Sequence, residues 1–295
     1  ALCIYDAMFY EQRGGHIRVL PGAPAGTFFW QWQGEHLLSP TRQPDVPAVT
    51  GLIFHLARCG STLLARLLAE DPNTLVLNEP DVLNTLLLAG MASDFVDPVP
   101  FADAVHQIAA HSAPHAKRVV IKTTSWNSVQ CDLLRASFPA AQALFLTRDP
   151  ADVLASLLSQ PPGWANSSNE WLLGPNSFES PTSVTAFASA LGKTIAAVEL
   201  SVRNAPLTWR LTAYEDLPTS APQCAEWLGA DPQAVADGAA QVASRDSKTG
   251  LAWAPRDRPE GQFWSGGSGQ YVDRMRSDLE TIRHSLASQS IGSTS

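Results

Sequence analysis

The chain has few cysteines and no arrangement of them that binds a metal. Its 295 residues include Cys3, Cys59, Cys131 and Cys224, which form neither a Cys-x-x-Cys pair nor another metal-ligand spacing. Scattered cysteines argue against a disulfide scaffold and favour reduced thiols, as in cytoplasmic proteins. We therefore expect a cytoplasmic protein that uses no metal.

Long apolar runs and an excess of positive charge are also missing. No apolar segment approaches the ~20 residues that a membrane helix needs, and the first residues do not form a signal peptide. The 20 Lys and Arg residues are outnumbered by 28 Asp and Glu, which gives a net charge of −8. A broad basic face for nucleic acid or an acidic membrane is therefore not expected. A pocket with a few cations could still bind a small anionic ligand, and a homodimer remains open.

The composition and length are those of a globular protein. Hydrophobic residues make up 45% of the chain and charged residues 16%, which allows one large α/β domain or two smaller ones. Residues 1–49 differ from the rest because prolines punctuate them and Thr27–Gln33 alternates in character. We expect a β-rich extension or small hairpin there, packed on a domain that spans 50–295.

Short apolar runs alternate with helical patterns along residues 50–295. The expected strands are 52–56, 74–77, 118–121, 143–147 and 207–211. The expected helices begin at Leu63 and then cover 82–88, 101–111, 129–137, 184–203, 224–228, 235–243 and 271–288. Residues 161–181 should form a long loop, either a lid or plain surface. This order predicts a three-layer α/β fold with a mainly parallel sheet.

Polar side chains follow each expected strand. They are Arg58, Glu79, Lys122, Arg148, Tyr214 and Glu215. In open parallel sheets ligands bind at the carboxyl ends of the strands. Cations and a carboxylate at one such edge predict a group-transfer site for an anionic donor.

Arg58-Cys59-Gly60-Ser61-Thr62 joins the first expected strand to a helix. A small-residue turn at a helix start presents backbone N–H groups and the positive end of the helix dipole to a phosphate. The turn lacks the lysine and the earlier glycine of an ATP-hydrolysing loop, since Ser61 and His55 hold those positions. A bare turn without a ligand is the alternative.

Two further motifs follow strands. Arg148-Asp149-Pro150 predicts a capped helix, with Arg148 at the strand end and Ser156 about two turns into the helix. Tyr214-Glu215-Asp216-Leu217, followed by Trp227-Leu228-Gly229, should support the fold.

Together these motifs resemble the sulfotransferase family over residues 51 to about 230. The phosphosulfate loop of that family reads roughly Pro-(Lys/Arg)-Ser-Gly-(Ser/Thr)-Thr, and this chain has Ala57 and Cys59 in place of Pro and Ser. The family also holds the 3′-phosphate with an Arg and a Ser spaced as Arg148 and Ser156 are. The resemblance implies a P-loop NTPase-like fold and the donor 3′-phosphoadenosine-5′-phosphosulfate (PAPS), which leaves as 3′,5′-adenosine bisphosphate (PAP).

The resemblance also implies roles for single residues. Arg58 would stabilise the leaving phosphate, while Cys59, Gly60, Ser61 and Thr62 would cradle it. Lys122 would be a mobile cation near the transferred group. Ser247 and Lys248 are candidates for the late basic segment that completes the nucleotide site.

The catalytic base is the point where family branches differ. Many members use a His in a Lys-Thr-His segment, but this chain has Thr124 there. Other branches use a Glu on the strand after the loop, which Glu79 matches. Burial would have to raise the pKa of Glu79 from ~4.3, and the alternative is an ion pair with Lys122 or Arg58. His55 should be a core histidine. A small-molecule kinase and a non-catalytic nucleotide-binding relative remain the other functions.

Overall fold

The computed structural model describes residues 47–80, 115–166, 169–174, 180–217, 219–243 and 269–290, with short pieces within 3–33 and 83–113. Among these residues, no helix combines the length and the apolar character that crossing a membrane requires. The expected helices 82–88 and 101–111 are described only in part, and their described positions are helical.

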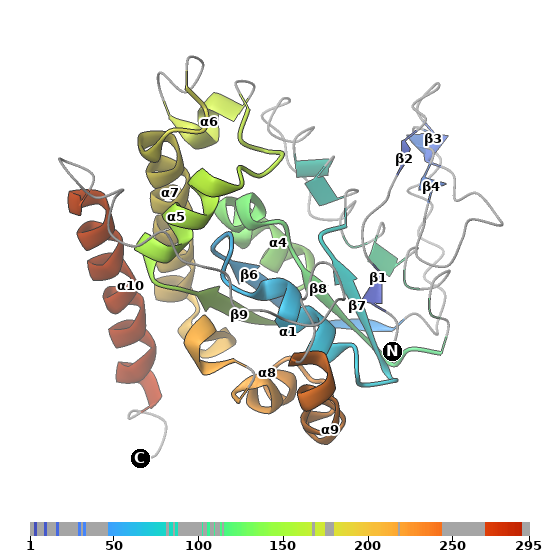
Figure 1. Ribbon diagram of the computed structural model, residues 1–295. Helices are drawn as coiled ribbons and strands as arrows, with labels where there is room; N and C mark the ends of the chain where they lie inside the picture. The colour runs from blue at the N-terminus through green and yellow to red at the C-terminus, as the bar shows by residue number, and fades with distance from the viewer. Residues whose placement is uncertain are drawn as a thin grey trace.

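One parallel sheet forms the centre of the molecule (Figure 1). Its strands are β1 (Cys3–Ile4), β6 (Ala48–His55), β7 (Thr74–Asn78), β8 (Arg118–Lys122), β9 (Gln142–Thr147) and β10 (Trp209–Ala213). They lie in the order β1-β7-β8-β6-β9-β10, and every neighbouring pair is parallel. The chain leaves β6 toward β7 and β8 on one side and later adds β9 and β10 on the other. The loop after β6 therefore lies at the switch point where open sheets bind ligands.

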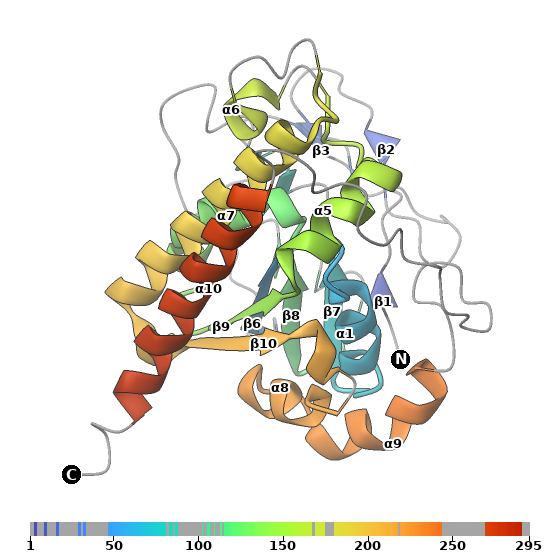
Figure 2. The same cartoon turned by 60° about the vertical axis from the view of Figure 1, so that its left-hand side comes forward.

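Helices cover both faces of this sheet. They are α1 (Ser61–Leu68), α4 (Cys131–Ser137), α5 (Pro150–Ser159), α6 (Glu170–Leu173), α7 (Val184–Asn204), α8 (Ala221–Trp227), α9 (Pro232–Ala243) and α10 (Gly269–Ser290). Figures 1 and 2 show α1, α8 and α9 on one side of the sheet and α7 with α10 on the other. The prediction of a three-layer α/β fold with a mainly parallel central sheet is confirmed.

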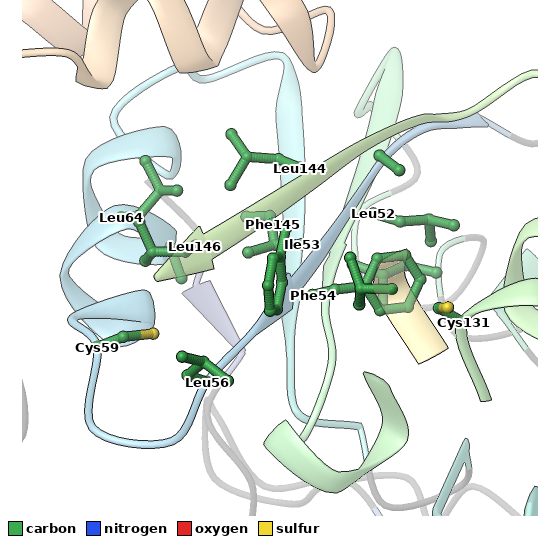
Figure 3. Packing of buried hydrophobic residues seen from close by; sticks show 14 of the residues in the cluster. Leu52, Ile53, Phe54, Leu56, Cys59, Leu64, Cys131, Leu144, Phe145 and Leu146 are labelled. Carbon is green, nitrogen blue, oxygen red and sulfur yellow. The ribbon is translucent and has the colours of Figure 1, made fainter. Parts of the chain in front are cut away.

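The apolar run of β6 is buried because layers lie on both of its faces. Leu52, Ile53 and Phe54 are all 0% exposed, as expected for a central parallel strand. Figure 3 shows them with Leu144 and Phe145 from the neighbouring strand β9. This packing fixes the end of β6, and with it the start of the following turn.

Three expected elements differ from the structure. The strand expected at 207–211 begins only at Trp209, because Pro206–Thr208 forms the 3-10 helix η3. The helix expected at 129–137 is α4 alone, preceded by the 3-10 helix η1 (Ser125–Gln130). The loop expected at 161–181 contains α6.

The described part of that loop packs on the core through aromatic rings. The Trp164 and Phe187 ring centroids are 6.1 Å apart, and those of Trp126 and Trp171 are 5.8 Å apart. Both pairs meet edge to face, an arrangement that stabilises aromatic contacts. The prediction of a lid stays open, but these tryptophans anchor the segment to η1 and α7.

The N-terminal segment contributes strands of its own. Within it, β1 forms the edge of the central sheet beside β7. The other pairs are β2 (Phe9–Tyr10) with β4 (Phe29–Trp30), parallel, and β3 (His16–Ile17) with β5 (Trp32–Gln33), antiparallel. Strands β4 and β5 thus pair with earlier segments and not with each other as a hairpin would. The domain division at residue 49 remains a prediction.

Candidate active site

The turn between β6 and α1 opens the site. Gly60 precedes the helix with a φ of 80°, and the N–H of Leu64 donates to its carbonyl at 3.1 Å. This bond is the first of the helix, so the N–H groups of Ser61 and Thr62 have no partner within the helix. They lie at its N-terminus, where the helix dipole is positive. The turn therefore has the backbone geometry of an anion site.

Arg58 and Glu79 have strained backbones. Their φ angles are 61° and 53°, and among the described residues they are the non-glycine residues with positive φ. Such conformations cost about 1–3 kcal/mol each and concentrate at functional sites. Each residue follows a parallel strand at the same edge of the sheet, Arg58 after β6 and Glu79 after β7. The strain thus marks the edge at which the sequence predicted a site.

Arg148, at the end of β9, reaches the turn. Its Nη1 donates to the carbonyl of Arg58 at 3.3 Å, and its Nη2 donates to Asp152 Oδ2 at 3.0 Å. Its guanidinium lies 4.7 Å from the centroid of the Tyr214 ring, a cation–π contact. A Cβ on Gly60 would lie 2.4 Å from Cδ2 of that ring. Tyr214 therefore fills the space between the turn and Arg148.

The sequence placed Tyr214 at the predicted ligand edge of the sheet but gave its motif a role in the fold. The structure places it in contact with two site residues at the carboxyl end of β10. Its position after a strand had identified it together with Arg58 and Arg148, but its contact with both the turn and Arg148 could not be read from the sequence.

Lys122 and Glu79 are brought together. Lys122 is 1% exposed and its Nζ donates to Glu79 Oε1. The N–H of Glu79 also donates to the Lys122 carbonyl at 2.6 Å. This is the ion pair that the sequence left as the alternative to a catalytic base. Glu79 itself is 38% exposed, so its carboxylate is open to the outside of the site while Lys122 is buried.

The side chain of Cys59 is buried in the core. It is 0% exposed, and its sulfur lies in the cluster that contains Leu56, Leu64 and Leu146 (Figure 3). Burial raises the pKa of its thiol to about 12, so the group is neutral at physiological pH. Only the backbone of Cys59 is available to a phosphate.

His55 is a core histidine, as expected. It is 3% exposed, with Nδ1 2.9 Å from the Leu56 carbonyl and Nε2 2.8 Å from the Thr123 carbonyl. Burial, together with the positive charge of Lys122, lowers its pKa to about 4. The neutral ring links the end of β6 to the segment that follows Lys122.

Helix α5 begins beside Arg148. Asp149 caps it by accepting from the Ala151 N–H at 2.9 Å, and Pro150 occupies its first position. Arg276 from α10 pairs with both oxygens of Asp149, at 2.8 and 3.0 Å. Burial acts to raise the pKa of Asp149, but hydrogen bonds from Arg276 and Ala151 outweigh it and hold that pKa below its usual value.

The C-terminal end of α5 is also in contact with a site residue, Arg58. Ser156 lies half-buried in its second half, and Arg58 donates to the carbonyl of Gln160 just after the helix. The structure thus gathers Arg58, Gly60, Arg148 and Lys122 with Glu79 at one sheet edge. Ser247 and Lys248 lie outside the described residues. No three His, Cys, Asp or Glu side chains in the described part of the chain are placed to share a metal.

Comparison with known proteins gave similar structures but no similar sequence families. No protein-family model matches the chain, and no curated protein matches it. A sulfotransferase from Alicyclobacillus acidocaldarius aligns at 12% identity and a TM-score of 0.40, covering 81% of this chain and 96% of that one. The sulfotransferase STF9 from Mycobacterium avium aligns at 13% identity and a TM-score of 0.44, covering 74% of this chain and 72% of that one. A sulfotransferase domain from the curacin biosynthetic pathway aligns at 16% identity and a TM-score of 0.43, covering 79% of this chain and 98% of that one.

All three are sulfotransferases. At such low identity the similarity carries no residue roles, and the function proposed below rests on the geometry of the site.

Proposed function

We propose that this chain is a sulfotransferase that moves a sulfuryl group from PAPS to a hydroxyl or amine of a small-molecule acceptor. One observation carries the proposal. Arg148 donates to the carbonyl of Arg58, 90 residues earlier, so two predicted phosphate-binding motifs meet at one sheet edge.

The site residues fit a donor with two phosphate positions. The N–H groups of Ser61 and Thr62 at the start of α1 would hold the 5′-phosphate. Arg148 would hold the 3′-phosphate, assisted by Ser156 and by Ser247 and Lys248 from the later segment. Among the described residues, Arg148 Nε is a buried donor without a hydrogen-bond partner. A phosphate oxygen would supply that partner, and charge-assisted bonds of this kind are strong.

The transfer step uses the neighbouring charges. The acceptor oxygen forms a bond to sulfur while the bond from sulfur to the 5′-phosphate oxygen breaks, and PAP leaves. The acceptor proton passes to the Glu79 carboxylate, which Lys122 holds in place. Negative charge grows on the leaving phosphate, where the Arg58 and Lys122 cations stabilise it. An amine acceptor would lose its proton to Glu79 in the same way.

Calorimetry separates this proposal from its alternatives. We expect PAP to bind with a Kd in the micromolar range and ATP with magnesium to bind much more weakly, because the turn has no lysine after Gly60. PAPS should then be converted to PAP when an acceptor is present. Binding of ATP alone would favour a small-molecule kinase. PAP binding without any conversion of PAPS would favour a non-catalytic relative.

A further inference from the structure

Asn78 ends β7 with an unusual side chain. It is 7% exposed, and its Oδ1 has no hydrogen-bond partner among the residues that the structure describes. Buried amide oxygens are almost always paired in native proteins, because an unpaired one loses the hydrogen bonds that water would give it. Because the unpaired oxygen of Asn78 lies at the sheet edge that carries the site residues, we expect a ligand to donate a hydrogen bond to it.

The position of Asn78 relates it to the ion pair. Asn78 and Lys122 are register partners in the parallel strands β7 and β8, so their side chains leave the same face of the sheet. Lys122 donates to the carboxylate of Glu79, the residue after Asn78, whose φ of 53° turns the chain out of the strand. The amide of Asn78 therefore lies beside the group that would accept the proton.

We propose that Asn78 Oδ1 accepts a hydrogen bond from the acceptor substrate. The inference rests on the proposed sulfuryl transfer and deepens it. A carbonyl oxygen cannot pair with the sulfonate or phosphates of the donor, because these groups only accept hydrogen bonds. The partner is then an N–H or O–H group, and we place it on the acceptor, next to the atom that Glu79 deprotonates. The acceptor class is thus one with two adjacent donors, a diol or an amino alcohol.

Asn127 offers a matched control for the stability part of the test. It is also a buried asparagine, 1% exposed, but both the oxygen and the nitrogen of its side-chain amide are hydrogen-bonded. Its Nδ2 donates to Asn84 Oδ1 at 2.9 Å and its Oδ1 accepts from the Thr124 N–H at 2.9 Å. Asn127→Leu should lower the melting temperature, whereas Asn78→Leu should leave it unchanged or raise it. If Asn78→Leu lowered the melting temperature as much as Asn127→Leu does, the inference would be overturned.

Catechol and its monomethyl ether guaiacol test the specificity. With PAPS as donor, wild type should have a kcat/KM for catechol about 10-fold above that for guaiacol, the effect of one hydrogen bond to a buried group. Asn78→Leu should bring this ratio to about one while its affinity for PAP stays that of wild type. A wild-type protein that uses both equally or uses neither, or a variant that keeps the preference, overturns the inference. If wild type did not bind PAP at all, the proposed function itself would be overturned.

Discussion

Arg148 Nη1 lies 3.3 Å from the carbonyl oxygen of Arg58 and donates to it. The bond joins the end of β9 to the turn after β6, two neighbouring strands of the central sheet. Tyr214 packs against both sides of this junction, under the Arg148 guanidinium and against Gly60. The turn between β6 and α1 is therefore held in place by residues that follow β9 and β10 as well as by its own residues.

Gly60→Ala should unfold more easily than wild type. Gly60 has a φ of 80°, and a Cβ there would lie 2.4 Å from the Tyr214 ring. Left-handed strain and overpacking together should cost about 2–4 kcal/mol, measured by urea unfolding. Gly192→Ala is the control, since nothing lies within 4 Å of that Cβ inside α7 and it should gain about 0.5–1 kcal/mol. Wild-type stability in Gly60→Ala would contradict the packing.

Cys59 should be unreactive while the protein is folded. Burial raises the pKa of its thiol to about 12, so almost no thiolate is available to iodoacetamide. Labelling, followed by peptide mass spectrometry, should be slow in buffer and fast in urea. Cys59→Ser should keep the affinity for PAP within about twofold, since only backbone groups would contact the phosphate. Rapid labelling in buffer would show that the thiol faces the site.

Asp71 should make the fold sensitive to acid. Burial acts to raise its pKa, but hydrogen bonds hold that pKa below its usual value. The donors are Thr74 Oγ1 and the N–H groups of Asn73 and Asp231. A lowered pKa means that the stabilisation is complete above about pH 4 and is lost as the pH falls toward the folded pKa.

Asp71→Asn isolates this contribution. The variant should lose about 2 kcal/mol of unfolding free energy at neutral pH. The gap between the two proteins should narrow as the pH falls below about 4, because wild type then loses the same charge. Urea unfolding across this range gives the measurement. A gap that stays constant with pH would show that the charge of Asp71 adds nothing.

Substitutions at Glu79 should separate its charge from its contact with Lys122. Glu79→Gln keeps an oxygen for the buried Lys122 ammonium, so it should fold and bind PAP as wild type does. Its transfer rate should fall by about 10²–10⁴-fold, the usual contribution of a general base. Glu79→Ala should also lose stability, because it leaves the Lys122 charge unpaired. Normal turnover by Glu79→Gln would mean that another group is the base.

The sequence predicted the elements that depend on local pattern. The apolar run Leu52–Leu56 and the small residues after Arg58 are contiguous, so the strand and the turn could be read directly. Parallel pairing then placed Arg58, Lys122 and Arg148 at one edge, because the carboxyl ends of parallel strands lie together. The same rule placed Glu79 there.

Contacts between distant segments could not be read in this way. The two residues of β1 are too short to give a pattern, and their pairing with β7 depends on the finished sheet. The bond from Arg276 to Asp149 joins helices 127 residues apart in the chain. Whether Glu79 would pair with Lys122 was undecided, because it depends on where the chain turns at a φ of 53°. Long-range packing decides each of these contacts.

Calorimetry with PAP on Arg148→Ala tests the central claim most directly. Arg203→Ala is the matched control, since it removes the same charge from an exposed pair at the end of α7. We predict that wild type and Arg203→Ala bind PAP equally and that Arg148→Ala loses at least about 10-fold in affinity, the effect of about 1.4 kcal/mol. Equal binding by all three proteins would contradict the account.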